Sequence, residues 1–241
     1  MKSFIIGIAG QKNSGKDTVA SMISYITNVG IAKANYQEWI TKKAIYDLKF
    51  KNHIIHFADS LKDCISIMYG IKRRYFDIRD YKDNQWYCFK SRRFITYQEA
   101  VEGKYHIIEM NDLYNQSLRE IISEAKADCV IQLRTLLKYI GTDICRNYLD
   151  DNIWVTSTML KAHAIADESN YCIIADVRFA NEANAIMKSS LYGGVIVINR
   201  HNDDEIDHPS ETIDFEGKYY IDNNGSKLQL FYKVLQIMQN I

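Results

Sequence analysis

The chain has 241 residues, enough for one α/β domain with insertions and a substantial core. Its 30 basic and 30 acidic side chains cancel, which argues against a chain-wide electrostatic grip on DNA or RNA. Five cysteines without a Cys-x-x-Cys pair indicate neither a disulfide framework nor a zinc site. We therefore expect a reducing, cytoplasmic setting, and no apolar run approaches the length of a membrane span.

A short apolar run, Phe4 to Ala9, precedes the most informative stretch of the chain. That stretch reads Gly10-Gln11-Lys12-Asn13-Ser14-Gly15-Lys16-Asp17-Thr18. Glycine at both ends lets backbone N–H groups turn inward around an anion, and the helical pattern that follows adds the positive end of its dipole. Strand, loop and helix in this order predict a phosphate loop that binds a nucleoside triphosphate.

Lys16 follows the second glycine, where a lysine reaches the outer phosphates and a side-chain oxygen after it holds Mg²⁺. Asp17 and Thr18 both offer such an oxygen, and the pattern leaves open which one contacts the metal. The alternative is an ordinary glycine-rich turn in which Asp17 caps the helix. The candidate residues for binding ATP are Asn13, Ser14, Gly15, Lys16, Asp17 and Thr18.

Two helices and a strand are predicted next. Apolar residues recur at helical spacing from Gly15 to about Asn28, and Gln37 to Lys49 reads as an amphipathic helix. His53 to Ala58 is a predicted strand, followed by a helix whose cap is Asp59 or Ser60. Lys62 lies in the first turn of that helix, where a cation is poorly placed for the dipole unless a phosphate binds nearby. A solvated lysine is the alternative.

Cations and aromatic residues alternate between Ile71 and Cys129. The mixture suits stacking on nucleotide bases with contacts to phosphates, or else a subdomain whose rings pack on one another. We expect an inserted substrate or lid region at about 72–128, and a surface helix from Tyr114 to Asp128. The polar loop from His201 to Glu216 is a second candidate lid.

An amphipathic helix is predicted from Val130 to Ile140, ending at Gly141 as its C′ residue, with Thr142 or Asp143 capping the next helix. Arg134 and Lys138 are four residues apart on one face, and two such cations repel unless an anion lies nearby. On spacing alone, Trp154 is a core residue.

Tyr171 to Asp176 is a buried strand that ends in a carboxylate, the layout of a Walker B aspartate that faces a phosphate loop. Arg178 and Glu182 follow at helical spacing, and a weak surface ion pair is the alternative interpretation of the two. Further strands at 195–199 and 218–222, the turn at 223–226 and a C-terminal helix complete the pattern. The alternation predicts a doubly wound, mostly parallel five-stranded sheet with helices on both faces.

Together these motifs resemble the phage-type deoxynucleoside monophosphate kinases, P-loop enzymes that transfer the γ-phosphoryl group of ATP to a deoxynucleotide. The resemblance spans nearly the whole chain, in order. The matching residues are Ser14-Gly15-Lys16-Asp17-Thr18, Phe57-Ala58 with Leu61-Lys62, Arg134, Gly141-Thr142-Asp143, Trp154, Asp176-Val177-Arg178 with Glu182, His208-Pro209-Ser210-Glu211 and Asn224-Gly225-Ser226.

The resemblance implies a single kinase domain over 1–241 that uses ATP and Mg²⁺, and site residues in three groups. The catalytic group is Lys16, Arg134, Asp176 and Arg178. The substrate group is Lys62, Arg134, Lys138, Gly141, Thr142, Trp154, Asp176, Arg178 and Glu182. The metal group is Asp17, Thr18 and Asp176. The partners implied are a deoxynucleoside monophosphate and ATP, without stable nucleic-acid binding or membrane attachment. The setting is the host cytoplasm if the protein is viral, and a homodimer stays open.

Other P-loop kinases remain as alternatives, namely enzymes similar to phosphomevalonate kinase or dephospho-coenzyme A kinase. A P-loop ATPase attached to a nucleic-acid machine is a further alternative, although the balanced charge argues against it. A purely structural role would have to explain away the glycine-bounded loop and Asp176 together.

Overall fold

The computed structural model describes residues 3–11, 13–189, 191–200 and 213–241. The chain forms two compact units, Met1–Phe57 with Val155–Ile241, and Ala58–Trp154. The segment 72–128, which we expected as an insertion, lies inside the second unit. The motif residues 208–211, most of the predicted lid at 201–216, and Lys12 lie outside the described residues.

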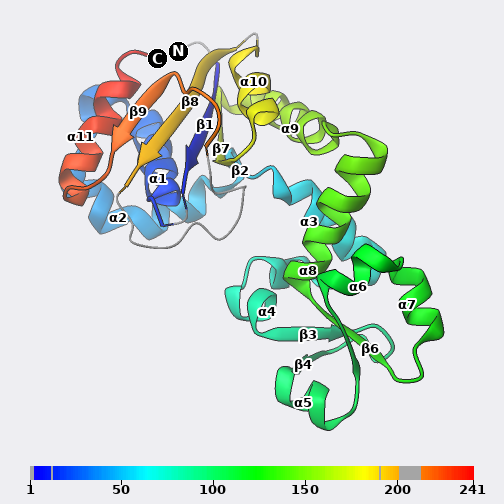
Figure 1. Ribbon diagram of the computed structural model, residues 1–241. Coiled ribbons are helices and arrows are strands. Elements are labelled where there is room, and N and C mark those ends of the chain that lie inside the picture. The colour runs from blue at the N-terminus through cyan, green and yellow to red at the C-terminus, as the bar shows by residue number, and fades with distance from the viewer. Residues whose placement is uncertain (1–2, 12, 190, 201–212) are drawn as a thin grey trace. The chain divides into compact units, whose positions relative to one another are not determined.

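The first unit alternates strands and helices (Figure 1). Its elements are β1 (Phe4–Gly10), α1 (Lys16–Val29), η1 (Ile31–Lys33), α2 (Tyr36–Lys49), η2 (Lys51–His53), β2 (Ile54–Ile55), α9 (Ile153–Ser169), β7 (Tyr171–Val177), α10 (Ala180–Met187), β8 (Tyr192–Asn199), β9 (Tyr219–Asp222) and α11 (Lys227–Met238). Local sequence explains two of the helix starts. The Asn35 side chain accepts hydrogen bonds from the first turn of α2, and Ser226 forms a capping box with Gln229 at the start of α11.

Five strands form one parallel sheet in the order β2-β7-β1-β8-β9, so β1 lies at its centre. The strands are apolar runs that are buried on both faces, as a sheet covered by helices requires. The predicted five-stranded α/β fold is confirmed, although β2 is shorter than predicted because it pairs with β7 only at Ile54 and Ile55.

Helices cover both faces of this sheet. Side chains alternate along β1, so Phe4, Ile6 and Ile8 pack in one core with residues of α1 and α11. The intervening Ile5 and Ala9 pack in a second core with residues of α9 and α10. This double winding holds the carboxyl end of β1, where the chain enters the glycine-bounded loop, rigidly between two hydrophobic layers.

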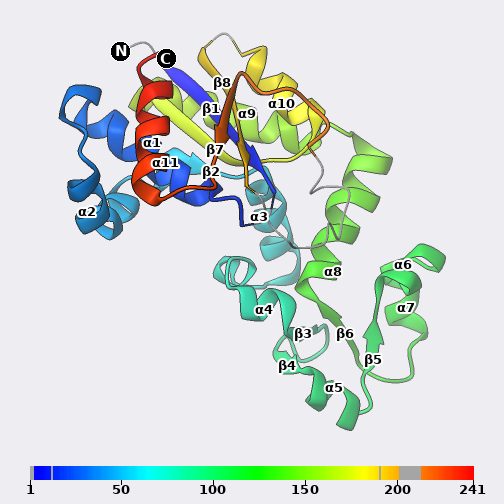
Figure 2. The same cartoon turned by 60° about the vertical axis from the view of Figure 1, so that its left-hand side comes forward.

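The second unit is a mixed α/β unit with its own core (Figure 2). Its elements are α3 (Ala58–Tyr69), η3 (Arg73–Phe76), α4 (Arg79–Asp83), β3 (Gln85–Cys88), β4 (Phe94–Thr96), α5 (Tyr97–Glu102), β5 (His106–Ile108), α6 (Met110–Asn115), α7 (Leu118–Glu124), β6 (Cys129–Gln132), α8 (Leu133–Lys138) and the π-helix η4 (Tyr139–Leu149). Its four-stranded sheet has the order β4-β3-β6-β5, in which β3 is antiparallel to β4 and β6. The strand β5 is parallel to β6.

The aromatic residues of the second unit pack on one another. The rings of Tyr75 and Tyr81 stack with centroids 4.3 Å apart, and Phe94 meets both of them edge to face. Tyr87 contacts Phe94 and Phe89 in the same way. For these residues, mutual packing accounts for the aromatic content that also suggested base stacking.

The predicted helix end at Gly141 is wrong. Gly141 lies inside the π-helix η4, and its φ is not positive. A Cβ at this position would lie 2.5 Å from Cδ2 of Leu61, so the glycine serves the close approach of α3 and η4 rather than a helix cap. Thr142 and Asp143 consequently lie within η4 and cap no new helix.

Three other boundaries also differ from prediction. Residues 129–132 form β6, and the helix starts only at Leu133. Asp59 and Ser60 lie inside α3, which starts at Ala58. The predicted helix from Tyr114 to Asp128 is replaced by α6 and α7, because Ser117 and Glu120 form a capping box that starts α7 anew. Among the helices of the described residues, none has both the length and the apolar character needed to cross a bilayer.

Candidate functional site

In the loop that joins β1 to α1, Asn13 and Gly15 take backbone conformations that favour an anion site. Gly15 is the N-cap of α1 with φ +101°, in the left-handed region that glycine adopts without strain. Asn13 also has a positive φ, +63°. Among the described residues, which leave out Lys12, no side chain caps the start of α1. The N–H groups at the start of this 14-residue helix therefore remain available to a ligand.

Lys16 is the first residue of α1, and its ammonium lies over the loop. Its Nζ donates hydrogen bonds to the carbonyl oxygens of Gly10 and Gln11, each at 2.7 Å. The positive charge is thus held at the mouth of the loop, where the helix dipole also favours negative charge.

A pocket of about 380 Å³ adjoins this loop. It is lined by Asn13, Gly15, Lys16, Asp17, Thr18 and Arg200. The structure therefore brings five of the six predicted ATP-binding residues together around one cavity. Asp17 is exposed and Thr18 is half-buried, so both oxygens can face a metal bound in the pocket.

Ser14, the sixth predicted residue, is fully buried beneath the loop. Its Oγ has no hydrogen-bond partner among the described residues. Its carbonyl oxygen accepts a hydrogen bond of 2.8 Å from Nδ2 of Asn223. Ser14 thus contributes backbone anchoring and a hydroxyl that still requires a partner.

Asp176 lies near the carboxyl end of β7, the strand beside β1. Its Oδ1 accepts a hydrogen bond from the backbone N–H of Phe57 at 2.8 Å, which fixes the orientation of the carboxylate. The second oxygen remains available for a further contact. Within the described part of the first unit, the side chain of Asp176 does not line the pocket at the loop.

Glu182 is buried and caps α10. Its Oε2 accepts hydrogen bonds from the backbone N–H groups of Arg178 (2.8 Å) and Phe179 (3.2 Å). The predicted proximity of Arg178 and Glu182 is thus a hydrogen bond to the Arg178 main chain. The Arg178 side chain is exposed just beyond β7. Glu182 fixes the backbone that carries Arg178.

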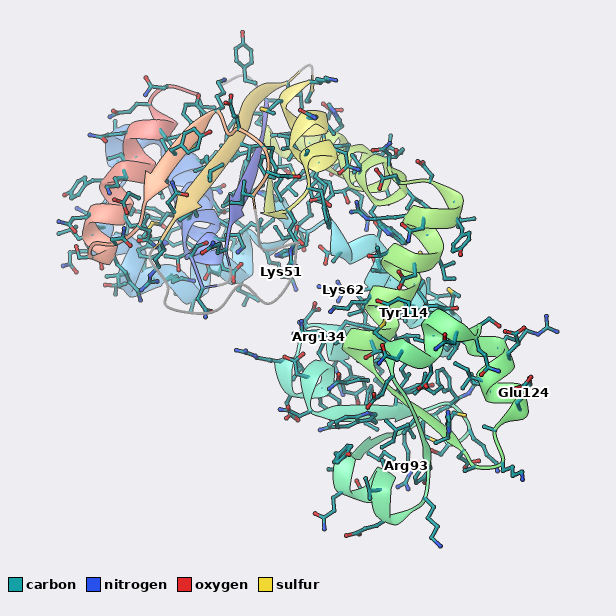
Figure 3. All side chains as sticks on the ribbon, viewed as in Figure 1. Lys51, Lys62, Arg93, Tyr114, Glu124 and Arg134 are labelled. Carbon is teal, nitrogen blue, oxygen red and sulfur yellow. The ribbon has the colours of Figure 1, made fainter. Side chains whose placement is uncertain are left out.

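In the second unit, Lys62 projects from α3 (Figure 3). It belongs to a network of charges on α3, on η3 and at Asp77, the residue that follows η3. Its Nζ lies 2.9 Å from Asp77 and 3.7 Å from Asp59. Arg73 binds the same two carboxylates, at 2.6 and 2.8 Å, and Asp63 at 2.7 Å. The alternative interpretation of Lys62 as a solvated side chain does not hold, because two carboxylates contact its ammonium group. The predicted binding of a phosphate by Lys62 stays a prediction.

Arg134, on α8, donates through Nε (2.8 Å) and Nη2 (2.7 Å) to one carboxylate oxygen of Asp83. Lys82 lies close to this pair. Burial lowers the pKa of Lys82, and the nearby charges of Arg134 and Lys62 lower it further, against the opposing effect of Asp83 and Asp77. The positive charges of Lys82, Arg134 and Lys62 therefore oppose one another, with Asp83 and Asp77 partly offsetting them.

Trp154 and Gly141 contact each other directly. The Trp154 Nε1 donates to the Gly141 carbonyl oxygen at 3.0 Å, and the indole is buried in the core of the second unit. Lys138 and Thr142 are exposed on α8 and η4.

Four residues of these sites were not predicted from the sequence: Arg200, Asn223, Arg73 and Lys82. Arg200 and Asn223 follow β8 and β9 directly. Polar residues immediately after parallel strands lie at the edge where ligands bind, so this position was a usable signal. Arg73 and Lys82 lie in the short helices η3 and α4, where no sequence period distinguishes them from other cations.

The central β1, the glycine-bounded loop at its carboxyl end and Lys16 at the start of the next helix belong to an α/β fold that is consistent with the P-loop NTPase type. The family model for deoxynucleotide monophosphate kinase matches residues 4–234, and the chain belongs to that family. One relative, the deoxynucleoside-5′-monophosphate kinase of Escherichia phage T5, is 24% identical over 230 residues, which are 87% of this chain and 84% of the relative. The family resemblance is confirmed, and the chain is a phosphotransferase.

Proposed function

We propose that this chain transfers the γ-phosphoryl group of ATP to the phosphate of a deoxynucleoside monophosphate, which yields the diphosphate and ADP. Family membership supports the acceptor class. The loop between β1 and α1 supports ATP as the phosphoryl donor. The observation behind this proposal is that Lys16, the start of α1 and the left-handed Gly15 adjoin one pocket.

The donor phosphates would lie against the N–H groups of this loop and of the first turn of α1. Lys16 would exchange its bonds to main-chain carbonyl groups for bonds to phosphate oxygens, which are stronger because both partners are charged. The buried Ser14 Oγ is a further donor that an ordered water or phosphate oxygen can satisfy.

Asp17, Thr18 and Asp176 are the residues that would hold Mg²⁺. Asp17 and Thr18 line the pocket and supply carboxylate and hydroxyl oxygens, the donor atoms that this hard cation prefers, so these two residues fit the metal. Asp176 does not line the pocket, and its part in holding the metal rests on its carboxylate chemistry alone. When bound, Mg²⁺ neutralises charge on the phosphate oxygens of the donor.

In the transfer, an oxygen of the acceptor phosphate forms a bond to the γ-phosphorus, and the bond from that phosphorus to the β–γ bridging oxygen breaks. The acceptor phosphate is already ionised at neutral pH, so no strong base is needed. Asp176 acts by orienting the acceptor or the metal. Lys16, Arg134 and Arg178 supply positive charge to the transferred group.

Lys62, Arg134 and Lys138 are the proposed acceptor-phosphate ligands, with Thr142 as a neutral hydrogen-bonding partner. Gly141, Trp154 and Glu182 support the site through the main-chain and packing contacts described above. A cytoplasmic setting, the absence of stable nucleic-acid binding and a homodimer remain predictions.

The test is ATP consumption with Mg²⁺ and each nucleoside or deoxynucleoside monophosphate in turn, with the products separated chromatographically. We expect diphosphates from one or more deoxynucleotides, and loss of turnover in Lys16→Ala but not in the exposed control Lys33→Ala. Phosphorylation of phosphomevalonate or dephospho-coenzyme A instead would identify another kinase. ATP turnover that depends on DNA and forms no phosphorylated small molecule would identify an ATPase.

A further inference from the structure

The turn Asn223-Asn224-Gly225-Ser226, between β9 and α11, has no role in the reaction proposed above. Asn223 is nevertheless one of the few buried polar residues of the first unit, with an exposed fraction of 8%. Its backbone N–H donates to the carbonyl oxygen of Asn199 at 2.8 Å, which extends the contact between β8 and β9. The Asn223 side chain therefore starts from a rigid part of the sheet.

That side chain reaches the loop between β1 and α1. Its Nδ2 donates a buried hydrogen bond of 2.8 Å to the carbonyl oxygen of Ser14, a residue that is itself fully buried. The carbonyl and the N–H of one trans peptide point in opposite directions. Because the Ser14 carbonyl is held on Asn223, the N–H of Gly15 is turned away from Asn223.

The fit between Asn223 and the loop is close. A Cβ on Gly15 would lie 2.7 Å from Nδ2 of Asn223, so any other residue at this position would push the amide away from Ser14. The glycine thus serves a close approach as well as its left-handed φ of +101°. Gly15, near the start of the chain, and Asn223, near its end, therefore fit each other closely.

We propose that Asn223 is a positioning residue for the donor phosphates: it fixes the peptide between Ser14 and Gly15 so that the Gly15 N–H faces the bound phosphate chain. This role rests on the proposed donor site at the same loop. It assigns to a residue of the last β–α turn a function in phosphate binding that involves no contact with the ligand. A residue that only braced α11 would contribute to stability and not to phosphate affinity.

The test compares Asn223→Ala with the neighbouring exposed control Asn224→Ala, in the full-length protein. The dissociation constants for ATP and for inorganic tripolyphosphate are measured by calorimetry with Mg²⁺, together with the free energy of unfolding. In Asn223→Ala we expect both ligands to bind about tenfold more weakly, as the loss of one positioning hydrogen bond predicts. The two losses should be equal because the affected contact is to phosphate, and the control should match the wild type.

Unchanged tripolyphosphate affinity in Asn223→Ala, with or without a loss of stability, would overturn the proposal. So would a loss confined to ATP, because the affected contact would then involve the base or the sugar. If Asn223→Ala does not fold, Asn223→Leu refills the volume without a hydrogen-bond donor and serves the same comparison. Lys16→Ala separates the two claims: if it too leaves tripolyphosphate binding unchanged, the donor site itself is wrong, and not only the role of Asn223.

Discussion

In the first unit the candidate site is a stretch of main chain, whereas in the second unit it is a set of charged side chains. The loop between β1 and α1 offers N–H groups and lies beside Lys16, and the left-handed φ values of Asn13 and Gly15 shape it. In the second unit, Lys62 and Arg134 are each held by carboxylates that come from other segments.

This difference has a consequence for ligand binding. A main-chain site is organised before the ligand arrives, so it loses little entropy on binding. Cations paired to carboxylates must exchange those partners for a phosphate. For Arg134, whose side chain is 52% exposed, this exchange costs little, because exposed ion pairs contribute only about 0–1 kcal/mol each. The first unit is thus suited to a donor bound in a fixed pose, and the second to an acceptor that displaces existing ion pairs.

Asp176 is an exception in the first unit, because the proposed function assigns a role to its charged side chain. Asp176→Asn keeps an oxygen that can accept the hydrogen bond from Phe57, so the fold should persist. We expect turnover to fall roughly 10²-fold or more, as for the loss of one group that stabilises transition-state charge. Steady-state rates and denaturant unfolding check this, with the exposed Asp167→Asn as the control. Full turnover in Asp176→Asn would contradict its role.

Arg134 tests the side-chain site of the second unit. Arg134 and Arg79 both contact Asp83, but only Arg134 is a proposed acceptor ligand. Arg134→Ala should raise the KM for the deoxynucleotide roughly 10- to 150-fold, which corresponds to a hydrogen bond to a charged group worth about 1.5–3 kcal/mol. Arg79→Ala should leave the KM near the wild-type value. Equal effects in the two variants would show that Asp83, rather than the acceptor, is what Arg134 serves.

Gly141 tests the packing beneath the side-chain site. Gly141→Ala should lower the free energy of unfolding by about 1–3 kcal/mol, because the new methyl group would meet Leu61. Glycine at an ordinary helical position would give the opposite result, since alanine favours helix by up to about 1 kcal/mol. Urea unfolding measures the change, with the exposed Thr142→Ala as the control. A more stable Gly141→Ala variant would contradict this account, because it would show that space at this position is not limiting.

Lys82 gives the smallest expected effect and depends on pH. Its pKa in the folded chain is lowered by burial and by Arg134 and Lys62, so folding disfavours its charged form at neutral pH. This unfavourable contribution is full below the lowered pKa and disappears as the pH rises towards the ordinary lysine value. The free energy of unfolding of the wild type should therefore increase over that range.

Lys82→Met should remove this pH-dependent increase and be more stable than the wild type at pH 7. Inorganic phosphate should stabilise the wild type more than the variant, because an anion relieves the repulsion among the cations. Thermal unfolding between neutral and alkaline pH, with and without phosphate, measures both effects, and the exposed Lys126→Met serves as the control. Identical pH profiles for Lys82→Met and the wild type would exclude a repelled lysine at this position.

The comparison of the two units also explains what the sequence could predict. The loop, Lys16 and the strand before them are contiguous, so local order alone revealed them. Asp176 was predicted as a site residue because it comes at the end of an apolar run that reads as a buried strand. Arg200 and Asn223 are far from the loop in sequence, but each donates a hydrogen bond to a carbonyl oxygen of the loop. The only signal for them in the sequence was that each directly follows a strand.

In the second unit, contacts between distant segments decide both fold and site. Gly141 carried the same signal that a helix C-cap would give, yet it serves packing against Leu61. Val130 and Ile131 fit a helical pattern but pair with β3, because a strand of four residues is too short for its period to be recognised. The ion network of Arg73 depends on η3 lying against α3, which no local pattern encodes.

The most direct measurement is a crossed binding experiment. Lys16→Ala and Arg134→Ala are each titrated, in the calorimeter, with ATP and Mg²⁺ and separately with the deoxynucleotide that the wild type phosphorylates best. A main-chain donor site in one unit and a side-chain acceptor site in the other predict that Lys16→Ala loses ATP affinity and keeps the deoxynucleotide. Arg134→Ala should show the reverse. Loss of both ligands in each variant, or of neither, would contradict this division between the two units.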